Sequence, residues 1–142
     1  MTIAAIIAGR SDSIASVAPE ALVSDVVGLL AERRIGAVPV LDGATLVGIL
    51  SERDVLRILA RDGASALNLQ AKDLMTSPVV TVEPSTTVIG SLSLMTRRRM
   101  RHLPVVENGR MVGFVSIGDL VKRRIDQIEA EAMAMREYIT SA

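Results

Sequence analysis

The chain of 142 residues contains no cysteine and no tryptophan, a single histidine and only two aromatic side chains, Phe114 and Tyr138. Without cysteine it can form neither a disulfide nor a thiolate nucleophile nor a Cys/His zinc site, and a Ser-His-Asp triad would depend on His102 alone. No other set of acid, base and nucleophile stands out, so we expect neither a bound metal nor an enzymatic activity. With 49% hydrophobic residues, the core must be built from Val, Ile, Leu, Ala and Met.

A charge of one sign and long hydrophobic runs are also missing. Sixteen basic and sixteen acidic residues balance, so no global field favours nucleic acid as a partner. The longest apolar stretch near the start, residues 3–8, is far shorter than the roughly 18–20 residues of a membrane span. It also lacks the flanks of a signal peptide. Together with the missing cysteines, this predicts a cytoplasmic protein without a membrane partner.

An internal duplication is the most informative feature that the sequence does contain. Residues 16–54 align with residues 81–119 at a constant offset of 65 positions and without a gap. Because two repeats cover most of the chain, we divide it into a first repeat (1–64), a second repeat (65–125) and a C-terminal helical extension (126–142). The identical pairs include Val17/Val82, Pro19/Pro84, Val23/Val88, Pro39/Pro104, Val40/Val105, Val47/Val112, Gly48/Gly113, Ser51/Ser116 and Asp54/Asp119.

Each repeat is predicted to begin with a strand and a helix. A short β-rich piece, residues 14–17 or 79–82, is followed by Pro19 or Pro84, and we place this proline in the first turn of the helix. Apolar residues then recur at helical spacing, and a basic cluster ends each helix, where the dipole favours cations. These clusters are Arg33-Arg34 and Arg97-Arg98-Arg99.

A hairpin and a second helix complete each repeat. Two apolar runs flank Asp42-Gly43 in the first repeat and Asn108-Gly109 in the second, and such dipeptides are typical of hairpin turns. Ser51 and Ser116 follow the second run and can each cap a helix. The order β-α-β-β-α predicts an α/β (α+β) fold. In it, two pseudo-symmetric repeats pack through their sheets, their interface forms the core, and a C-terminal helix is added.

An apolar stripe continues along the predicted C-terminal helix. Such a stripe can cover the molecule's own core or form a seam between two subunits, and the sequence leaves both interpretations open. Its members are spaced alternately four and three residues apart: Val121, Ile125, Ile128, Ala132, Met135 and Ile139.

The repeated motifs resemble those of a cystathionine β-synthase (CBS) domain pair. The resemblance implies a stand-alone regulatory or signalling module, usually a homodimer, which modulates a partner protein that the sequence does not identify. It also implies an adenosine-containing ligand such as AMP, ATP, NAD or S-adenosylmethionine, bound in clefts between the repeats, and no obligatory cofactor. The motifs that carry it are Pro39-Val40 and Pro104-Val105, Val47-Gly48 and Val112-Gly113, the repeated Gly-x-x-Ser-x-x-Asp, and residues 73–76 with 79–82.

The motif Ser51-x-x-Asp54, repeated as Ser116-x-x-Asp119, has two interpretations from its residues alone. A helix start presents free backbone N–H groups and the positive end of the dipole to a phosphate, and an aspartate three residues later can accept hydrogen bonds from ribose hydroxyls. The same spacing is also a variant of the capping box, in which side chains satisfy the helix's own N–H groups. The family resemblance implies that these four residues line the nucleotide clefts.

The cations near the two motifs differ. Arg53 lies inside the first motif, whereas Gly118 occupies the corresponding position in the second. We therefore predict that the first site binds phosphorylated ligands more tightly, because an arginine adds a charge-assisted hydrogen bond. Arg101 and His102 replace two small residues of the first copy and can complement phosphates at the mouth of the cleft. For His102 a capping or surface role is equally compatible with the sequence.

Adenine recognition is expected to use aliphatic walls and backbone amides, because we find no Trp or Tyr for either cleft. The apolar residues at the family's contact positions can also simply form the core. Two classes of function therefore remain: a ligand-sensing regulatory module, and a ligand-free structural or dimerisation module. By family position, the resemblance implies contacts from Ile14, Ser16, Val38 and Pro39 in the first repeat and from Val79, Thr81, Leu103 and Pro104 in the second.

Overall fold

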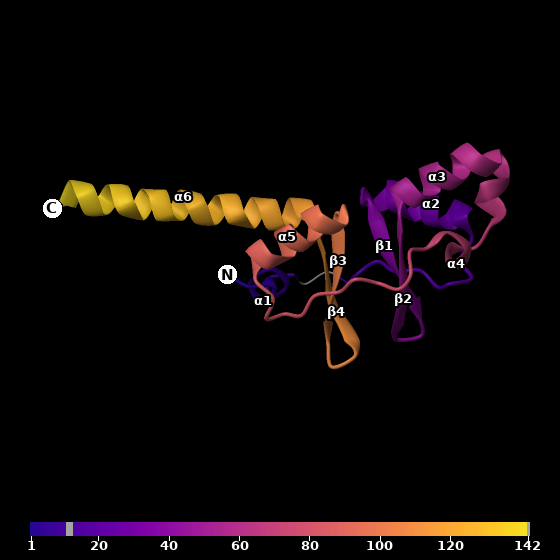
Figure 1. Ribbon diagram of the computed structural model, residues 1–142, viewed down its shortest axis with the longest axis horizontal. Helices are drawn as coiled ribbons and strands as arrows, with labels where there is room; N and C mark the ends of the chain where they lie inside the picture. Colours follow the sequence, from indigo (N-terminus) through magenta and orange to yellow (C-terminus); the bar gives the residue numbers. More distant parts are fainter. Residues whose placement is uncertain (11–12, 142) are drawn as a thin grey trace.

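The computed structural model describes residues 1–10 and 13–141. It consists of two similar halves, each with a two-stranded antiparallel sheet, and a long C-terminal helix that projects away from them (Figure 1). This arrangement confirms the predicted mixed α/β fold with two repeats. The elements are, in order, α1 (Ile3–Ile7), α2 (Val23–Arg33), β1 (Ala37–Asp42), β2 (Thr45–Ser51), α3 (Glu52–Asp62), the 3-10 helix η1 (Gly63–Asn68), α4 (Ala71–Leu74), α5 (Val88–Arg98), β3 (His102–Glu107), β4 (Arg110–Ser116) and α6 (Ile117–Ser141).

The two hairpins, β1–β2 and β3–β4, are closely similar, and both ladders contain a register shift near the middle. The second hairpin turns at Asn108-Gly109, as predicted, with both residues at positive φ. The first turns at Gly43-Ala44 rather than at Asp42-Gly43, because Asp42 is still paired with Thr45. Of the two residues in this first turn, only Gly43 has a positive φ, a conformation that glycine adopts readily.

The strand predicted at the start of each repeat is much shorter than expected. It is reduced to a single parallel bridge, from Val17 to Val40 in the first repeat and from Val82 to Val105 in the second. Backbone hydrogen bonds flank each bridge on both sides: the N–H of Val17 donates to a β1 carbonyl, and its carbonyl accepts from the N–H of Leu41. The β propensity of these pieces therefore provides one point of attachment to each hairpin rather than a third full strand.

The helices α2 and α5 begin four residues after the prolines, so our placement of Pro19 and Pro84 in the first helical turn was wrong. The carbonyl of Pro19 accepts a hydrogen bond from the N–H of Lys72 in α4, and that of Pro84 accepts one from Ala4 in α1. The prolines thus hold the short helices α4 and α1 against the segments that precede α2 and α5.

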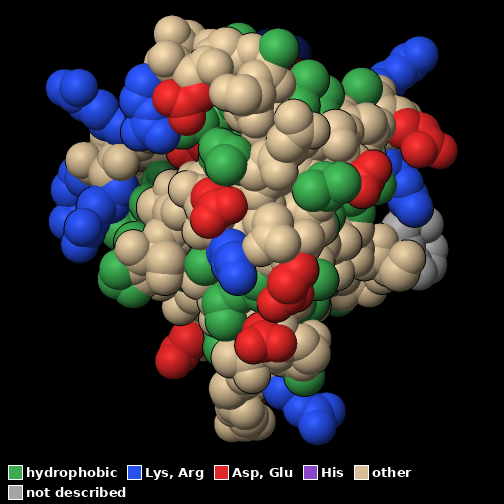
Figure 2. All heavy atoms as spheres, turned by 90° about the vertical axis from the view of Figure 1, so that its right-hand side faces the viewer, with side chains coloured by type: hydrophobic (Ala, Val, Ile, Leu, Met, Phe, Trp, Pro, Cys, Tyr) green, Lys and Arg blue, Asp and Glu red, His purple; other side chains and the backbone are tan. Residues whose placement is uncertain are grey.

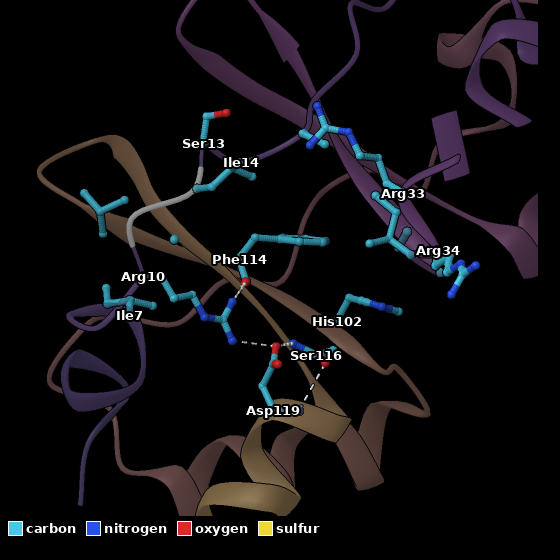
Figure 3. Close-up of a pocket in the computed structure, with 16 residues that line it drawn as sticks. Ile7, Arg10, Ser13, Ile14, Arg33, Arg34, His102, Phe114, Ser116 and Asp119 are labelled. Carbon is cyan, nitrogen blue, oxygen red and sulfur yellow. Dashed lines mark hydrogen bonds and ion pairs between the residues drawn. The ribbon is translucent and has the colours of Figure 1, made fainter. Parts of the chain in front are cut away.

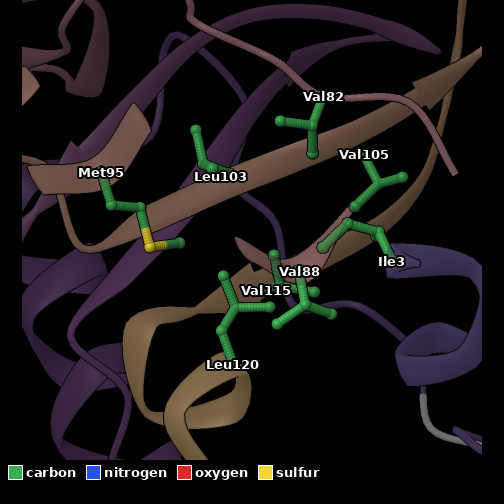
Figure 4. Packing of buried hydrophobic residues seen from close by; sticks show 8 residues of the cluster. All are labelled: Ile3, Val82, Val88, Met95, Leu103, Val105, Val115 and Leu120. Carbon is green, nitrogen blue, oxygen red and sulfur yellow. The ribbon is translucent and has the colours of Figure 1, made fainter. Parts of the chain in front are cut away.

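Each short helix therefore packs on the other repeat: α1, from the first repeat, packs on the second, and α4, from the second repeat, packs on the first. Ile3 of α1 is fully buried in the core of the second repeat (Figure 4), and Ala71 of α4 is buried in the core of the first. The division at residue 64 follows the sequence repeat, whereas the packing crosses it. Each repeat has its own hydrophobic cluster, so our expectation that the interface between the repeats forms the core was wrong. Strands β2 and β4 contact each other between the two clusters.

The glycines of the repeated Val-Gly pairs lie where the short helices pack on the hairpins of the opposite repeats. A Cβ atom on Gly113 would lie 2.7 Å from Cγ2 of Ile7, and one on Gly48 would lie 2.5 Å from Sδ of Met75. Both separations are too short for real carbon contacts. A side chain on either glycine would therefore displace Met75, the residue after α4, or Ile7, the last residue of α1, because these side chains lie directly against β2 and β4.

Helix α6 has 25 residues and leaves the body of the molecule after its first turns (Figure 1). Leu120 is fully buried. The apolar stripe that begins at Val121 is exposed, so this stripe does not cover the molecule's own core. Figure 2 shows the face over the first repeat, on which basic and acidic side chains are mixed and apolar side chains are scattered between them.

Candidate functional site

Two cavities lie between the repeats. The larger, of about 720 Å³, is lined by Ser116 and Asp119 and is called the Asp119 cleft. The smaller, of about 280 Å³, is lined by Ser51 and Asp54 and is called the Asp54 cleft. Their volumes lie within and just below the range of roughly 300–1,000 Å³ that small-molecule sites occupy.

Each cleft combines one Ser-x-x-Asp motif with segments of the other repeat. In the Asp119 cleft, Ile14 and the end of α2 lie opposite the start of α6. In the Asp54 cleft, Val79 and the end of α5 lie opposite the start of α3. The two clefts are therefore related by the pseudo-two-fold symmetry of the repeats.

Both motifs form capping boxes. The N–H of Ser51 donates to Oδ2 of Asp54 over 2.9 Å, and the N–H of Asp54 donates to Oγ of Ser51 over 3.3 Å. The same two bonds join Ser116 and Asp119, over 2.8 and 3.2 Å. The structural interpretation of the motif is therefore correct. The capping role does not prevent the two carboxylates from contacting a ligand, because both aspartates also line the cavities.

Arg10 distinguishes the Asp119 cleft. Its guanidinium donates to the carbonyl of Phe114 over 2.9 Å and forms an ion pair with Oδ2 of Asp119 over 2.8 Å (Figure 3). Burial acts to raise the pKa of Asp119, but the Ser116 N–H and the Arg10 guanidinium together hold that pKa below its usual value. Asp119 is therefore a carboxylate at neutral pH, and its charge is already partly compensated before any ligand binds.

Both clefts are basic although the chain as a whole is neutral. The Asp54 cleft is lined by five arginines and two carboxylates, and the Asp119 cleft by three arginines and one carboxylate. Arg34 and Arg99 adopt the left-handed conformation, with φ of 53° at both, at the ends of α2 and α5. Arg53 reaches across the Asp54 cleft, where its Nη1 donates to the carbonyl of Arg99 over 3.5 Å. Such concentrations of arginine suit anionic groups.

His102 lines both clefts. Its ring stacks on the ring of Phe114, with 5.7 Å between centroids and 13° between planes. Burial lowers the pKa of His102 against the opposing effect of the Asp119 and Glu52 carboxylates, so the imidazole is neutral at pH 7. We predicted adenine recognition without Trp or Tyr and overlooked Phe114, which gives the Asp119 cleft an aromatic surface.

The structure brings nine of the fifteen predicted site residues to the clefts, in two groups that share His102. Ile14, Ser116 and Asp119 line the Asp119 cleft with His102. The Asp54 cleft is lined by Ser51, Arg53, Asp54, Val79, Arg101 and His102.

The other predicted positions line neither cleft among the described residues. Val38 and Leu103 have no exposed surface, because they point into the two hydrophobic clusters. Pro39 and Pro104 are also buried, and their carbonyls hold the bridges at Val17 and Val82. Ser16 and Thr81 are exposed but lie outside both cavities.

Several cleft residues were missed by sequence reasoning. Arg10 lies before the aligned part of the repeat, so nothing in the sequence connected it with Asp119. Thr76 belongs to a motif that carried the family resemblance and Pro78 follows it, but neither was assigned to a binding site. Arg33, Arg34, Arg98 and Arg99 were explained by the helix dipole alone. The signal that could have placed them at the clefts is their position directly before the strands that border the clefts.

Residues 1–10 and 13–141 contain no group of three or more His, Cys, Asp or Glu side chains that could hold a metal ion. In the same part of the chain, no helix combines the length and the apolar character needed to cross a membrane. Together the two clefts offer hydrogen-bond donors, arginine charge, three carboxylates and apolar walls. This set of groups suits a ligand with an anionic part, hydroxyl groups and a flat apolar part.

Comparison with known proteins places this architecture in a family. A model of the CBS domain matches the chain twice, at residues 8–61 and 71–126. The chain therefore belongs to the CBS domain family and is a CBS-domain pair protein, as the motifs indicated.

Solved structures share both the fold and part of the sequence. A CBS-domain protein from Burkholderia ambifaria MC40-6 is 40% identical, with 89% of this chain and 95% of that chain covered and a TM-score of 0.84. CBSX2, solved in complex with AMP, is 28% identical, with 90% and 98% covered and a TM-score of 0.75. Among curated relatives, the mitochondrial CBS domain-containing protein CBSX3 of Arabidopsis thaliana is 36% identical over 77 residues. That match covers 53% of this chain and 37% of CBSX3.

Proposed function

We propose that this protein is a regulatory module that binds adenosine-containing ligands, such as AMP, ATP, NAD or S-adenosylmethionine, in the Asp54 and Asp119 clefts. The observation that carries the proposal is the pair of basic clefts, each with a carboxylate at a helix start. The AMP complex of CBSX2, which shares the fold at 28% identity, supports the choice of ligand class. In this function the module acts as a homodimer in the cytoplasm and, on binding, changes its affinity for a protein partner.

The capping boxes are compatible with ribose binding. The N–H groups of Ser51 and Ser116 donate to Oδ2 of Asp54 and Asp119, so the other carboxylate oxygen can accept hydrogen bonds from ribose hydroxyls. Near Asp54, that oxygen is 3.9 Å from Nη1 of Arg57. One carboxylate can therefore cap its helix and hold a sugar at the same time. A cap and a ligand contact are not alternatives in this geometry.

The remaining groups divide the ligand between them. In the Asp54 cleft, Arg53 and Arg101 serve the phosphates by charge-assisted hydrogen bonds, and Val79 forms part of the wall for the adenine. In the Asp119 cleft, Ile14 takes the position of Val79, and the His102–Phe114 stack adds a flat surface. The Asp54 cleft is proposed to bind phosphorylated ligands more tightly, since it contains more arginines.

A thermal-shift panel with AMP, ADP, ATP, NAD, NADH and S-adenosylmethionine tests the proposal. A ligand present at about 100 times its dissociation constant should stabilise the fold by about 2.7 kcal/mol. Inorganic phosphate and adenosine serve as controls that separate anion binding from recognition of the nucleoside. The absence of a shift with every adenosine compound would overturn the proposal and favour the ligand-free interaction module, in which Ser-x-x-Asp acts only as a cap.

Calorimetry on variants then assigns the clefts. Asp54→Ala and Asp119→Ala should each abolish binding at one cleft and leave the other intact. Each variant first needs its unliganded melting point, because the loss of a helix cap alone costs about 0.5–2 kcal/mol. If both variants bind the responsive ligand as the natural chain does, the carboxylates hold no ribose and the assignment is wrong.

A further inference from the structure

Helix α6 carries an apolar face that is exposed and does not pack on the rest of the described residues. Beyond its first turns the helix extends away from both repeats (Figure 1), and its apolar residues are 41% exposed at Val121 and 66% exposed at Ile139. The α6 stripe is defined as Val121, Ile125, Ile128, Ala132, Met135 and Ile139.

The α6 stripe is not the face that packs on the body. Leu120 is fully buried, and Arg124 and Gln127 are half-buried and hydrogen-bonded to each other over 3.1 Å. Ile125 and Ile128 lie on a neighbouring face of the helix and are 49% and 48% exposed. A second helix can therefore approach the stripe without displacing Leu120, which attaches α6 to the core of the second repeat. The Arg124–Gln127 bond lies within α6, so Arg124 can exchange it for a carboxylate of a second helix.

The spacing of the stripe is that of a coiled coil. Steps of four and three residues alternate from Val121 to Ile139, which places Ile125, Ala132 and Ile139 at a positions and Val121, Ile128 and Met135 at d positions of a heptad. Apolar side chains therefore fill all six core positions of the heptads, as a coiled coil requires.

The charges that flank the stripe select one orientation. In a parallel pair in register, each g residue lies beside the e residue of the next heptad on the other helix. Arg124 then faces Glu129 of the second copy, and Glu131 faces Arg136 of the second copy. Each contact joins opposite charges and occurs twice in a symmetric dimer. The dimer therefore has four attractive pairs.

The antiparallel orientation is disfavoured by the same residues. With the two stripes in full overlap, Glu129 would face Glu129 of the second copy and Glu131 would face Glu131. Lys122 would face Arg136. Each of these contacts joins like charges, which opposes pairing in that orientation.

These charges have no opposite charge within reach on their own helix. Residues three and four positions from Arg124, Glu129, Glu131 and Arg136 include no oppositely charged side chain, so these four residues have no partner for the usual i,i+3 or i,i+4 pairs of a helix. Their alternating charges therefore form no attractive pairs along the helix, but they do form attractive pairs between two parallel helices.

We propose that two copies of this chain associate through the α6 stripe as a parallel, in-register, two-stranded coiled coil. The inference deepens the proposed homodimer by assigning its interface, and it does not depend on the ligand. Parallel pairing places the two CBS-domain pairs at the same end of the coil.

Cysteine cross-linking tests the orientation, and it is specific because the chain contains no cysteine. In the full-length protein, Met135→Cys should give a disulfide-linked dimer under mild oxidation. In a parallel pair in register, each d residue lies opposite the same residue of the second copy. Glu137→Cys, two positions away on the outer face of the coil, is the matched control and should remain monomeric on a non-reducing gel. The proposal is overturned if Met135→Cys does not cross-link, if Glu137→Cys cross-links equally well, or if only a mixture of Ile125→Cys and Met135→Cys chains does so.

Charge reversal tests the interface by mass. Glu131→Arg should weaken self-association roughly 5- to 30-fold, measured by sedimentation equilibrium, because two attractive pairs become repulsive. Adding Arg136→Glu to that variant should restore the association. A dimer that is unaffected by Glu131→Arg overturns the coiled coil but leaves a homodimer through another surface. A monomeric natural chain overturns both, and the nucleotide-dependent thermal shift remains an independent measure of ligand binding.

Discussion

The Asp54 and Asp119 clefts are built from the same duplicated segments yet have different chemistry. In both, the Ser-x-x-Asp motif closes a capping box. Among the described residues, Asp119 also has an ion pair at 2.8 Å with Arg10, whereas the nearest arginine of Asp54 is at 3.9 Å. Phe114 of one cleft corresponds to Ile49 of the other.

The comparison shows where a duplicated fold is free to diverge. Positions inside the two clusters are packed on all sides, so a change in volume there costs stability in either repeat. Positions that face the clefts contact solvent or ligand, and they have diverged in charge and aromaticity. Differences in binding should therefore arise from a few lining residues, while the backbone remains the same.

The prediction with the largest expected effect tests whether Leu103 belongs to the hydrophobic core and not to the binding site. Leu103→Ala should lower the free energy of unfolding by about 2–5 kcal/mol, because Leu103 is fully buried, and it should leave the affinity of the folded protein for nucleotide unchanged. Urea unfolding and calorimetry measure the two quantities. Ser16→Ala, at an exposed position outside both clefts, is the control and should alter stability by less than about 0.5 kcal/mol. A loss of affinity in a fully folded Leu103→Ala protein would contradict this assignment.

The second prediction concerns the arginines. Arg53→Ala should weaken AMP binding in the Asp54 cleft roughly 10- to 150-fold, which corresponds to the loss of one charged hydrogen bond of about 1.5–3 kcal/mol. Arg33→Ala is the matched variant in the Asp119 cleft and should affect the weaker site only. If Arg53→Ala leaves the affinity for AMP unchanged and Asp119→Ala abolishes the tighter site, the ranking of the clefts is reversed.

Much of this comparison could be predicted from the sequence. The offset of 65 residues is visible in the sequence itself. The turn at Asn108-Gly109 and the caps at Ser51 and Ser116 follow from local rules, because turns and helix starts depend on nearby residues. The packing of α1 and α4 on the opposite repeats could not be predicted, since it depends on contacts between residues about 50 to 80 positions apart, such as Ala71 N–H to Ala21 carbonyl and Ile3 N–H to Thr86 carbonyl.

The same limit applies to the site. Residues of the two motifs reached the clefts because a helix start fixes where they lie. Val38 and Leu103 were expected at the clefts from family position, but a strand alternates its faces, and here both side chains point into the core. Arg10 could not be anticipated because its partner, Asp119, is more than a hundred residues away in the sequence.

The third prediction compares the two caps. Ser51→Ala and Ser116→Ala should each destabilise the protein by about 0.5–2 kcal/mol, with the larger loss for Ser51. Oγ of Ser51 accepts the N–H of Asp54 and also donates to its Oδ2 over 2.9 Å, whereas Oγ of Ser116 accepts the N–H of Asp119. Thermal unfolding without ligand measures both. Equal losses would indicate that the additional hydroxyl bond contributes nothing to stability.

The smallest expected effect is a pH dependence that arises from His102. Burial lowers the pKa of His102 in the folded protein, whereas the unfolded chain should show the ordinary value near 6.5. As the pH falls below about 6.5, the unfolded chain takes up a proton first, so the free energy of unfolding declines until the pH passes below the folded-state pKa. His102 therefore contributes stability at neutral pH that is lost on mild acidification.

The variant His102→Ala isolates this contribution, because it introduces the residue that the first repeat has at the corresponding position, Ala37. Urea unfolding between about pH 7.5 and 5.5, where most carboxylates remain ionised, should show a decline in the natural chain and a smaller one in the variant. Asp119 provides the internal check. Its lowered pKa gives a loss of stability only at more acidic pH, from its usual pKa downward, and this loss should persist in His102→Ala. An unchanged slope in the variant would show that the imidazole becomes protonated in the folded protein as readily as in the unfolded chain.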